Sequence, residues 1–299
     1  DLRQHIFVTV LIVFGVYVVL NLGFSLMKGK GLGLEFINEL KPFAVSSFLV
    51  LLYLPFVYIL EKAFGLVSDY TLLELSDINH PALRLLSEQA PGTFQHSMQV
   101  SNLAESVVNA LGGNSILTRV GALYHDIGKI SHAENFIENQ SGGNIHNEES
   151  ATKIISHVKE GMLIAKKYNL PSQVADFIET HHGTSLTKYF YVSWVNANPG
   201  LEPNMLNFKY PGPKPHSIET AVLMMADAIE AASRTLQDYT VENIQNTVSN
   251  IIDSQLNDGQ FNEVSITLEQ ITKAKKIFAE KIKNIYHARI VYPEINSKN

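Results

Sequence analysis

Two long apolar runs open the chain, and shorter amphipathic segments follow them. Residues 6–27 carry no charged side chain and no histidine, and residues 43–60 are likewise uncharged. A helix needs roughly 20 mainly apolar residues to cross a bilayer, so both runs are long enough if the second extends to about residue 64. The pattern therefore predicts a two-helix transmembrane hairpin within residues 1–66, with a lipid bilayer around it.

The alternative for the first run is a secretory signal peptide. No small-residue cleavage site follows this run, and a second apolar run comes soon after it, so the transmembrane interpretation is favoured. The chain also begins with Asp1 rather than Met. We therefore expect it to be a fragment of a longer membrane protein.

Apolar positions after the hairpin recur at helical spacing, and no β-alternation of useful length interrupts them. We expect a connector helix within residues 67–90, where Asn79 caps a first turn that contains Pro81. Thr93 is expected to cap the next helix, which Gly112 ends. The chain from residue 91 to residue 292 is thus predicted to be an all-α bundle.

The remaining elements follow the same periodicity. Helices are expected at residues 115–130, 147–170, 171–183, 217–236 and 241–256, and from Thr267 onward, where Thr267 and Gln270 make a capping box. Residues 184–217 read as a long aromatic and proline-rich loop, a type that is usually functional or disordered. The two C-terminal helices either pack on the domain or pair two protomers in a homodimer, and packing on the domain is commoner.

Charge and cysteine content narrow the class of protein. The net charge of −6 gives no support for binding long nucleic acid, and the absence of cysteine excludes disulfides and a thiolate nucleophile. Membrane orientation is less clear, because Lys28, Lys30 and Lys41 lie between the apolar runs while only Arg3 and Lys62 flank them. By the positive-inside rule, this count places the loop between the runs in the cytoplasm.

The most informative polar residues are His125 and Asp126, an adjacent pair within the apolar run 120–130. Burying an imidazole beside a carboxylate is costly unless something compensates them, and a metal ion does so. Asp227 also lies within an apolar stretch, so a ligand or ion-pair role is favoured over exposure. Taken alone, His96 and His157 would more often be hydrogen-bonded or surface histidines.

Together these residues predict the ligand set of a two-metal hydrolase. Asp126 bridges two ions, and each ion has three further ligands: His96, His125 and Asp227 for the first, and His157, His181 and His182 for the second. Two ions of this kind hold a hydroxide between them for phosphodiester hydrolysis and stabilise the leaving oxygen. Ligands rich in imidazole favour iron, manganese or zinc over magnesium or calcium.

Lys129 lies about one helical turn from His125 and Asp126. We favour a catalytic role in which its ammonium binds a substrate phosphate and stabilises charge that develops on it. The alternative is a cation placed at the C-terminal end of a helix, where the macrodipole favours it.

The order of these histidines and aspartates is similar to that of the HD superfamily of metal-dependent phosphohydrolases. Longer motifs resemble the seven-transmembrane HD proteins, which include the PgpH-type phosphodiesterases of cyclic di-AMP. The motifs are FIENQ at 136–140, HVKEG at 157–161, HHGT at 181–184 and YPGPKP at 210–215. The resemblance covers residues 72 to about 236.

The resemblance implies an HD-domain helical bundle with a di-iron or di-manganese centre that hydrolyses cyclic di-AMP to linear 5′-pApA. It also implies that the apolar runs are the last two spans of a bacterial inner-membrane protein whose HD domain faces the cytoplasm. An extracytoplasmic ligand-sensing domain would precede them. This topology puts the loop between the spans outside, against the lysine count, and we follow the family.

Two positions depart from the family pattern. The basic stretch that often follows the HD motif is Ser131-His132-Ala133 here, and the family's Asn-Pro-His is Asn144-Ile145-His146, without the rigid proline. Substrate contacts are expected from Lys129, Asn139, Gln140, Asn144, His146, Tyr210 and Lys214, with Asn139, Gln140 and Asn144 suited to an adenine edge. The aromatic residues at 189–194 either stack on bases or pack against the bilayer or beneath the loop.

Two alternative functions remain open on sequence alone. Because the loops read the bases, the same centre could hydrolyse another cyclic or short linear dinucleotide. A receptor that binds nucleotide without cleaving it is the second alternative. The complete ligand set argues against the receptor, since binding alone does not require it.

Overall fold

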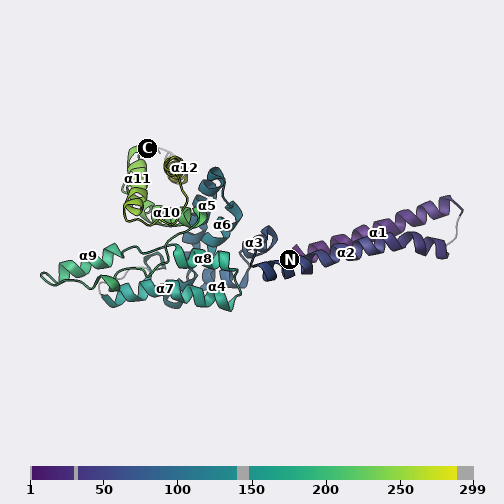
Figure 1. The fold of residues 1–299 in the computed structure, drawn as a ribbon. Coiled ribbons are helices and arrows are strands. Elements are labelled where there is room, and N and C mark those ends of the chain that lie inside the picture. The colour runs from purple at the N-terminus through teal and green to yellow at the C-terminus, as the bar shows by residue number, and fades with distance from the viewer. Residues whose placement is uncertain (1, 30–32, 140–147, 288–299) are drawn as a thin grey trace, which may run out of the picture. The chain divides into compact units, whose positions relative to one another are not determined.

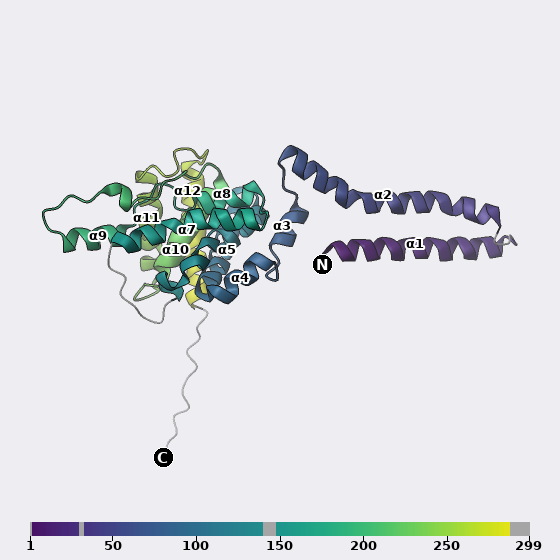
Figure 2. The ribbon, with the colours of Figure 1, turned by 90° about the horizontal axis from the view of Figure 1, so that it is seen from below.

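The computed structural model describes residues 2–29, 33–139 and 148–287 (Figures 1 and 2). Within these ranges the chain is helical, and the only β-type pairing is one bridge between Leu186 and Lys209. The predicted all-α fold class is therefore confirmed. The chain divides into two compact units, residues 1–70 and the residues from Thr71 onward.

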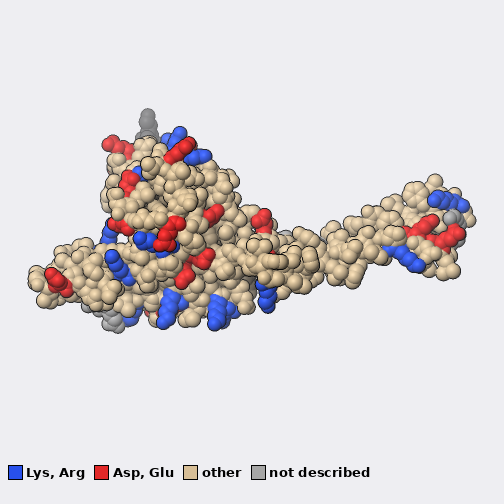
Figure 3. Space-filling model, in the orientation of Figure 1, with Lys and Arg blue, Asp and Glu red and all other residues tan. Residues whose placement is uncertain are grey.

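The first unit is an antiparallel hairpin of α1 (Leu2–Met27) and α2 (Leu34–Phe64). The Tyr17 ring stacks on Phe43 with the ring centres 4.4 Å apart, which holds the helices together. Both helices are long and apolar enough to cross a membrane, with mean hydropathies of 2.4 and 2.2. Figure 3 shows the hairpin almost free of charged side chains except at the end that joins its two helices. This exposed apolar surface is of the kind that a bilayer covers.

The rest of the chain alternates long helices with short connecting turns. Its elements are α3 (Asp69–Leu75), α4 (Pro81–Gln89), α5 (Pro91–Leu111), α6 (Ser115–Tyr124), η1 (Ile127–Asn135), η2 (Ile137–Asn139), α7 (Glu148–Lys167), α8 (Ser172–Thr180), α9 (Lys188–Ala197), η3 (Met205–Asn207), α10 (Ile218–Ser233), α11 (Val241–Asn257) and α12 (Leu268–His287). The helix α5 packs against α6 and α10, while α7 packs against η1 and α8.

The main core forms where α5 and α10 meet the two C-terminal helices. Val107 of α5, Val222 of α10, Ile252 of α11 and Phe278 of α12 are all fully buried in it. Each of these helices therefore places an apolar face inward, as the periodicity predicts. The sequence left open whether α11 and α12 pack on the domain or pair two protomers. In the structure they pack on the domain.

Several helix boundaries differ from the sequence prediction. His80, rather than Asn79, is the N-cap of α4, because its Nδ1 accepts a hydrogen bond from the Ala82 amide at 3.4 Å. The helix α5 already begins at Pro91, so Thr93 lies inside its first turn instead of capping it. By contrast, the predicted capping box at Thr267 is confirmed by reciprocal hydrogen bonds with Gln270 of 2.9 and 3.1 Å.

The expected loop at residues 184–217 contains two elements, α9 and η3. Tyr191 and Trp194 of α9 lie against Phe208, with ring centres 5.9 and 6.2 Å apart. Phe208 is fully buried, so this contact anchors α9 to the domain. The proline-rich composition of the segment had led to the prediction of a loop without a helix. These two aromatic residues therefore pack beneath the loop, one of the alternatives left open by the sequence.

Candidate metal centre

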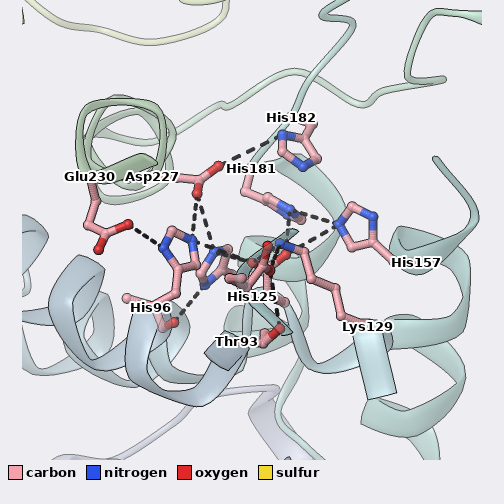
Figure 4. Close-up of polar contacts among 12 residues, drawn as sticks. Thr93, His96, His125, Lys129, His157, His181, His182, Asp227 and Glu230 are labelled. Atoms are coloured by element: carbon pink, nitrogen blue, oxygen red, sulfur yellow. Dashed lines mark hydrogen bonds and ion pairs between the residues drawn. The ribbon is translucent and has the colours of Figure 1, made fainter. Parts of the chain in front are cut away.

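All of the predicted metal ligands lie together in one site of the second unit (Figure 4). They come from the N-terminal part of α5 (His96), the turn between α6 and η1 (His125, Asp126), α7 (His157), the turn after α8 (His181, His182) and α10 (Asp227). They form two groups that share Asp126, and the ligand atoms within each group lie within 4.8 Å of one another. This grouping is the same as the one that the sequence assigned to the two ions.

The shared carboxylate of Asp126 faces both groups. Its Oδ2 lies 3.2 Å from His125 Nε2 and 3.6 Å from His96 Nε2. Its Oδ1 lies on the side of the second group, 3.4 Å from His157 Nε2 and 3.6 Å from His181 Nε2. One oxygen for each group is the arrangement that a bridging carboxylate requires.

Hydrogen bonds on the far side of three imidazole rings leave their Nε2 atoms free to bind an ion. Each Nδ1 lies within hydrogen-bond distance of the carbonyl three residues earlier: His125 to Ala122 at 2.7 Å, His157 to Ile154 at 2.5 Å and His181 to Ile178 at 2.9 Å. A carbonyl only accepts, so each Nδ1 carries the proton and, in the neutral ring, Nε2 carries a lone pair. The Nε2 atoms of His157 and His181 nevertheless face each other at 3.1 Å. A cation between them would turn this repulsive contact into ligation.

Unsatisfied buried atoms also show that the site fits metal ions. His125 Nε2 and Asp126 Oδ1 are buried without a hydrogen-bond partner, whereas Asp126 Oδ2 lies 2.8 Å from Lys129 Nζ. Buried polar atoms are costly in this state unless a ligand compensates them. Neutral imidazoles together with carboxylates form a donor set suited to divalent transition metals.

Burial controls protonation in the second group. It lowers the pKa of His157 to about 3, and together with the neighbouring His181 it lowers the pKa of His182 well below the usual value. Both rings are therefore neutral, the form that binds metal. Burial opposes the charged form of His125 as well, but Asp126 and Asp227 outweigh it and raise its pKa to about 10. The same negative charges favour a metal cation beside His125.

A close backbone approach holds the His125-Asp126 turn against α7. Gly128 lies in the first turn of η1, and a Cβ atom there would overlap the carbonyl oxygen of His157 and crowd the amide nitrogen of Gly161. Because this approach needs a short, tight segment, α6 ends at Tyr124 and a 3₁₀ helix follows. The sequence prediction of one helix over residues 115–130 was wrong for this reason.

Lys129 lies next to the shared carboxylate. Its Nζ is 2.8 Å from Asp126 Oδ2 and 2.8 Å from Glu138 Oε1. Burial disfavours the ammonium, but Asp126 and Glu138 outweigh this effect and raise the pKa of Lys129. Lys129 is therefore charged and held at the centre.

The structure places the predicted substrate contacts unevenly. Tyr210 stacks on the ring of His182 with centres 4.1 Å apart. Asn139 instead joins η2 to α5, since its Oδ1 accepts from the Thr93 amide at 3.1 Å and its Nδ2 donates to Thr93 Oγ1 at 2.8 Å. Lys214 Nζ donates to the Gly259 carbonyl at 2.9 Å. The other three predictions, Gln140, Asn144 and His146, lie outside the described residues.

A cavity of about 510 Å³ opens beside the second group. Its lining includes His181, His182 and Asp227 from the centre, Tyr210, and the aromatic residues Tyr189 and Phe190 of α9. A space of this size holds an organic ligand next to the metal-binding atoms. The sequence prediction that these aromatic residues contact bases is compatible with this position.

Sequence reasoning missed two acidic residues at the centre. Glu138 pairs with Lys129, and Glu230 lies 2.6 Å from Nδ1 of His96. Glu138 belongs to the FIENQ motif, in which the sequence analysis gave roles to Asn139 and Gln140 but none to the glutamate. Glu230 follows Asp227 by one helical turn in an apolar helix. This spacing places both carboxylates on one face of the helix and could have indicated that Glu230 lies near the centre.

Comparison with known proteins identifies the family. The HD domain matches residues 93–232. The chain is 38% identical over 299 residues to the cyclic-di-AMP phosphodiesterase PgpH of Bacillus subtilis, which covers 98% of this chain. The structure of the HD domain of Listeria monocytogenes PgpH in complex with cyclic-di-AMP is also similar, with 38% sequence identity and a TM-score of 0.66. The match covers 70% of this chain and 99% of that domain. The chain belongs to the HD-domain family.

Full-length relatives in this family extend well beyond the chain. It spans 41% of the Bacillus subtilis PgpH, and it is 40% identical to Listeria monocytogenes PgpH over 239 residues, which are 78% of this chain and 33% of that protein. The HD domain and the cluster of histidines and aspartates together indicate that the protein binds divalent metal ions.

Proposed function

We propose that this chain is the catalytic part of a membrane-bound phosphodiesterase that hydrolyses cyclic di-AMP to linear 5′-pApA with two metal ions. The central observation is Asp126, which presents one carboxylate oxygen to each of two ligand groups. Two observations support cyclic di-AMP as the substrate. A cavity lies beside the centre, and the chain is similar to PgpH proteins that are named cyclic-di-AMP phosphodiesterases. Iron or manganese suits the imidazole-rich ligands.

Two divalent ions, when bound, lower the pKa of a water molecule and neutralise charge that develops on the phosphate. The chain supplies the geometry of the reaction. His96, His125 and Asp227 would hold the first ion, His157, His181 and His182 would hold the second, and Asp126 would serve both. Lys129 keeps Asp126 ionised and lies close enough to the centre to contact a phosphate oxygen. Formation of 5′-pApA requires that the oxygen of a water molecule bonds to phosphorus, that the bond from phosphorus to a 3′ oxygen breaks, and that this 3′ oxygen gains the proton that the water loses.

The proposed location follows from the hairpin. We place α1 and α2 in the bacterial inner membrane, with the HD domain in the cytoplasm where dinucleotide second messengers act. The two candidate spans support this placement. An N-terminal extracytoplasmic sensor domain is proposed as the partner within the same protein, because the PgpH relatives are much longer than this chain.

A competition assay tests the activity and its specificity. The purified full chain, loaded with Mn²⁺, receives cyclic di-AMP, cyclic di-GMP and a linear dinucleotide together, and the products are separated by chromatography. We expect cyclic di-AMP to be cleaved before the other two dinucleotides, with 5′-pApA as the product. Preferred cleavage of another substrate would contradict the substrate, and retained metal with bound, uncut cyclic di-AMP would contradict the enzyme.

Substituting the shared ligand tests the mechanism. Asp126→Ala is expected to abolish turnover, by about 10⁴-fold or more, because an essential group is lost. Asp176→Ala is the matched control, since Asp176 faces His216 at 3.6 Å in an exposed pair and belongs to neither ligand group. Both variants should keep the helical circular-dichroism spectrum. Equal turnover in Asp126→Ala and wild type would refute the two-ion centre.

A further inference from the structure

His96 differs from three of its neighbours in what its second ring nitrogen contacts. His125, His157 and His181 each use a backbone carbonyl. The Nδ1 of His96 instead lies 2.6 Å from Glu230 Oε2, while its Nε2 lies 2.9 Å from Asp227 Oδ1 (Figure 4). Among the described ligands of the centre, this is the imidazole placed between two carboxylates.

One helix supplies both carboxylates. Asp227 and Glu230 are three residues apart on α10, so they share a face and meet the His96 ring from opposite sides. Glu230 only accepts when ionised, so Nδ1 of His96 donates to it and the lone pair of Nε2 points toward the ion. A bond to a carboxylate also makes the imidazole a stronger electron donor than a bond to a carbonyl does.

Arg234 holds Glu230 in this position. Arg234 Nε donates to Glu230 Oε1 at 2.7 Å, and Nη2 lies 2.6 Å from the same oxygen. The other oxygen, Oε2, remains for His96. The side chain of Glu230 is 6% exposed and that of Arg234 is 37% exposed, so the arginine links the buried carboxylate to the surface. A small cavity of about 240 Å³ reaches this pair from outside, between Gln95, Gln99 and Tyr286.

We infer that Glu230 and Arg234 are positioning residues that tighten binding of the first ion selectively. Glu230 fixes the tautomer and the orientation of His96, and Arg234 fixes Glu230. In the second group, the Nδ1 atoms of His157 and His181 face backbone carbonyls, and Nδ1 of His182 lies 3.9 Å from Asp227 Oδ2, beyond hydrogen-bond distance. Partners of this kind behind a metal-bound histidine change metal affinity by about 10- to 100-fold. The inference rests on the proposed two-ion centre and does not depend on the identity of the substrate.

A purely structural role for the pair of Glu230 and Arg234 would have a different effect on metal binding. If Glu230 and Arg234 only joined α10 to α5, their loss would lower the stability of the domain and weaken both ions together. A positioning role changes one binding step and leaves the other intact. The two ions therefore serve as internal controls for each other.

Manganese titration of the full chain separates these outcomes, with free Mn²⁺ measured by electron paramagnetic resonance. In Glu230→Gln we expect one of the two binding steps to weaken by about 10- to 100-fold while the other is unchanged. Excess Mn²⁺ should then restore turnover. Arg234→Lys, which keeps the charge but lacks the planar guanidinium, should fall between this variant and wild type.

Glu88→Gln is the matched control. Glu88 pairs with Arg84 four residues away, as Glu230 does with Arg234, but both side chains are exposed. It should leave both binding steps unchanged. Two equally weakened steps in Glu230→Gln, or two unchanged steps, would overturn the inference.

If Glu230→Gln does not fold, the same titration of Arg234→Gln decides the question, and unchanged manganese binding there overturns the inference. A wild-type chain that binds two Mn²⁺ ions but leaves cyclic di-AMP intact would refute the proposed function alone. The binding steps of the variants would still decide the roles of Glu230 and Arg234.

Discussion

The two halves of the proposed metal centre contain different types of ligand. The first group contains two carboxylates, Asp126 and Asp227, and a third carboxylate, Glu230, lies behind its His96. The second group has the shared Asp126 and three imidazoles. The first half therefore attracts an ion mainly by negative charge, and the second mainly by neutral nitrogen donors.

His182, in the second group, is the most exposed of the seven candidate ligands. His125 is fully buried, whereas His182 has a quarter of its side chain exposed and lines the larger cavity beside Tyr210. This difference suggests a division of labour, in which the first ion holds the shared carboxylate in place and the second ion meets the substrate. Predictions that treat the two halves separately test this division.

Graded metal removal should have the largest effect. As chelator is added to the Mn²⁺-loaded chain, the second ion is expected to leave first, because its group offers one shared carboxylate against two in the first. Turnover should fall to background at this step while one ion remains bound. Metal content and hydrolysis measured on the same samples check this order.

The variant His182→Gln assigns the two steps. It should retain one ion with the affinity of the tighter wild-type step, because His182 belongs to the second group. Simultaneous loss of both ions in wild type, or loss of the tighter step in this variant, would contradict the division.

Gly128→Ala should have a smaller effect, directed at the second half. The added Cβ would overlap the backbone carbonyl of His157, which cannot move without shifting α7. Overpacking of this kind costs about 1–3 kcal/mol of stability, and the displaced His157 should weaken the second ion more than the first. Gly23→Ala is the control, since a Cβ there meets no atom within 4 Å. Urea unfolding and manganese titration measure the two effects, and an unchanged second step would argue against this role of Gly128.

The contrast between the halves also shows how far sequence reasoning reaches. The order and spacing of the histidines and aspartates, read against the HD family, placed the candidate ligands in the same two groups that the structure brings together. Helix periodicity located α5, α7, α8, α10, α11 and α12, but it missed α9 within the expected loop. It failed at α6, since Gly128 approaches α7 through a tertiary contact that no local period records.

The support behind the ligands could not be predicted in the same way. Glu230 meets His96 across 134 residues of sequence, and only the packing of α10 on α5 joins them. Asn139 showed the converse: its amide suited an adenine edge by type, but the fold places it on the backbone and side chain of Thr93. Residue type predicts the chemistry available to a side chain, and the partner depends on the tertiary fold.

The smallest effect is expected from a hydroxyl group that supports the first half. Tyr124 directly precedes His125 and is fully buried, and its hydroxyl donates to the Leu75 carbonyl at 2.9 Å, with His80 Nδ1 3.0 Å away. Tyr124→Phe keeps the ring that packs the end of α6 but leaves the carbonyl without this donor. We expect a loss of about 1 kcal/mol in urea unfolding and no change in either manganese step.

The control for this hydroxyl is Tyr168→Phe, at a partly exposed residue just after α7, where the unfolding curve should not move. A weakened first manganese step in Tyr124→Phe would show that the contact with Leu75 sets the position of His125 as well as the stability of the domain. The first half would then depend on α3 as well as on α10. The second half, whose ligands come from α7 and the turn after α8, would keep its affinity in either case.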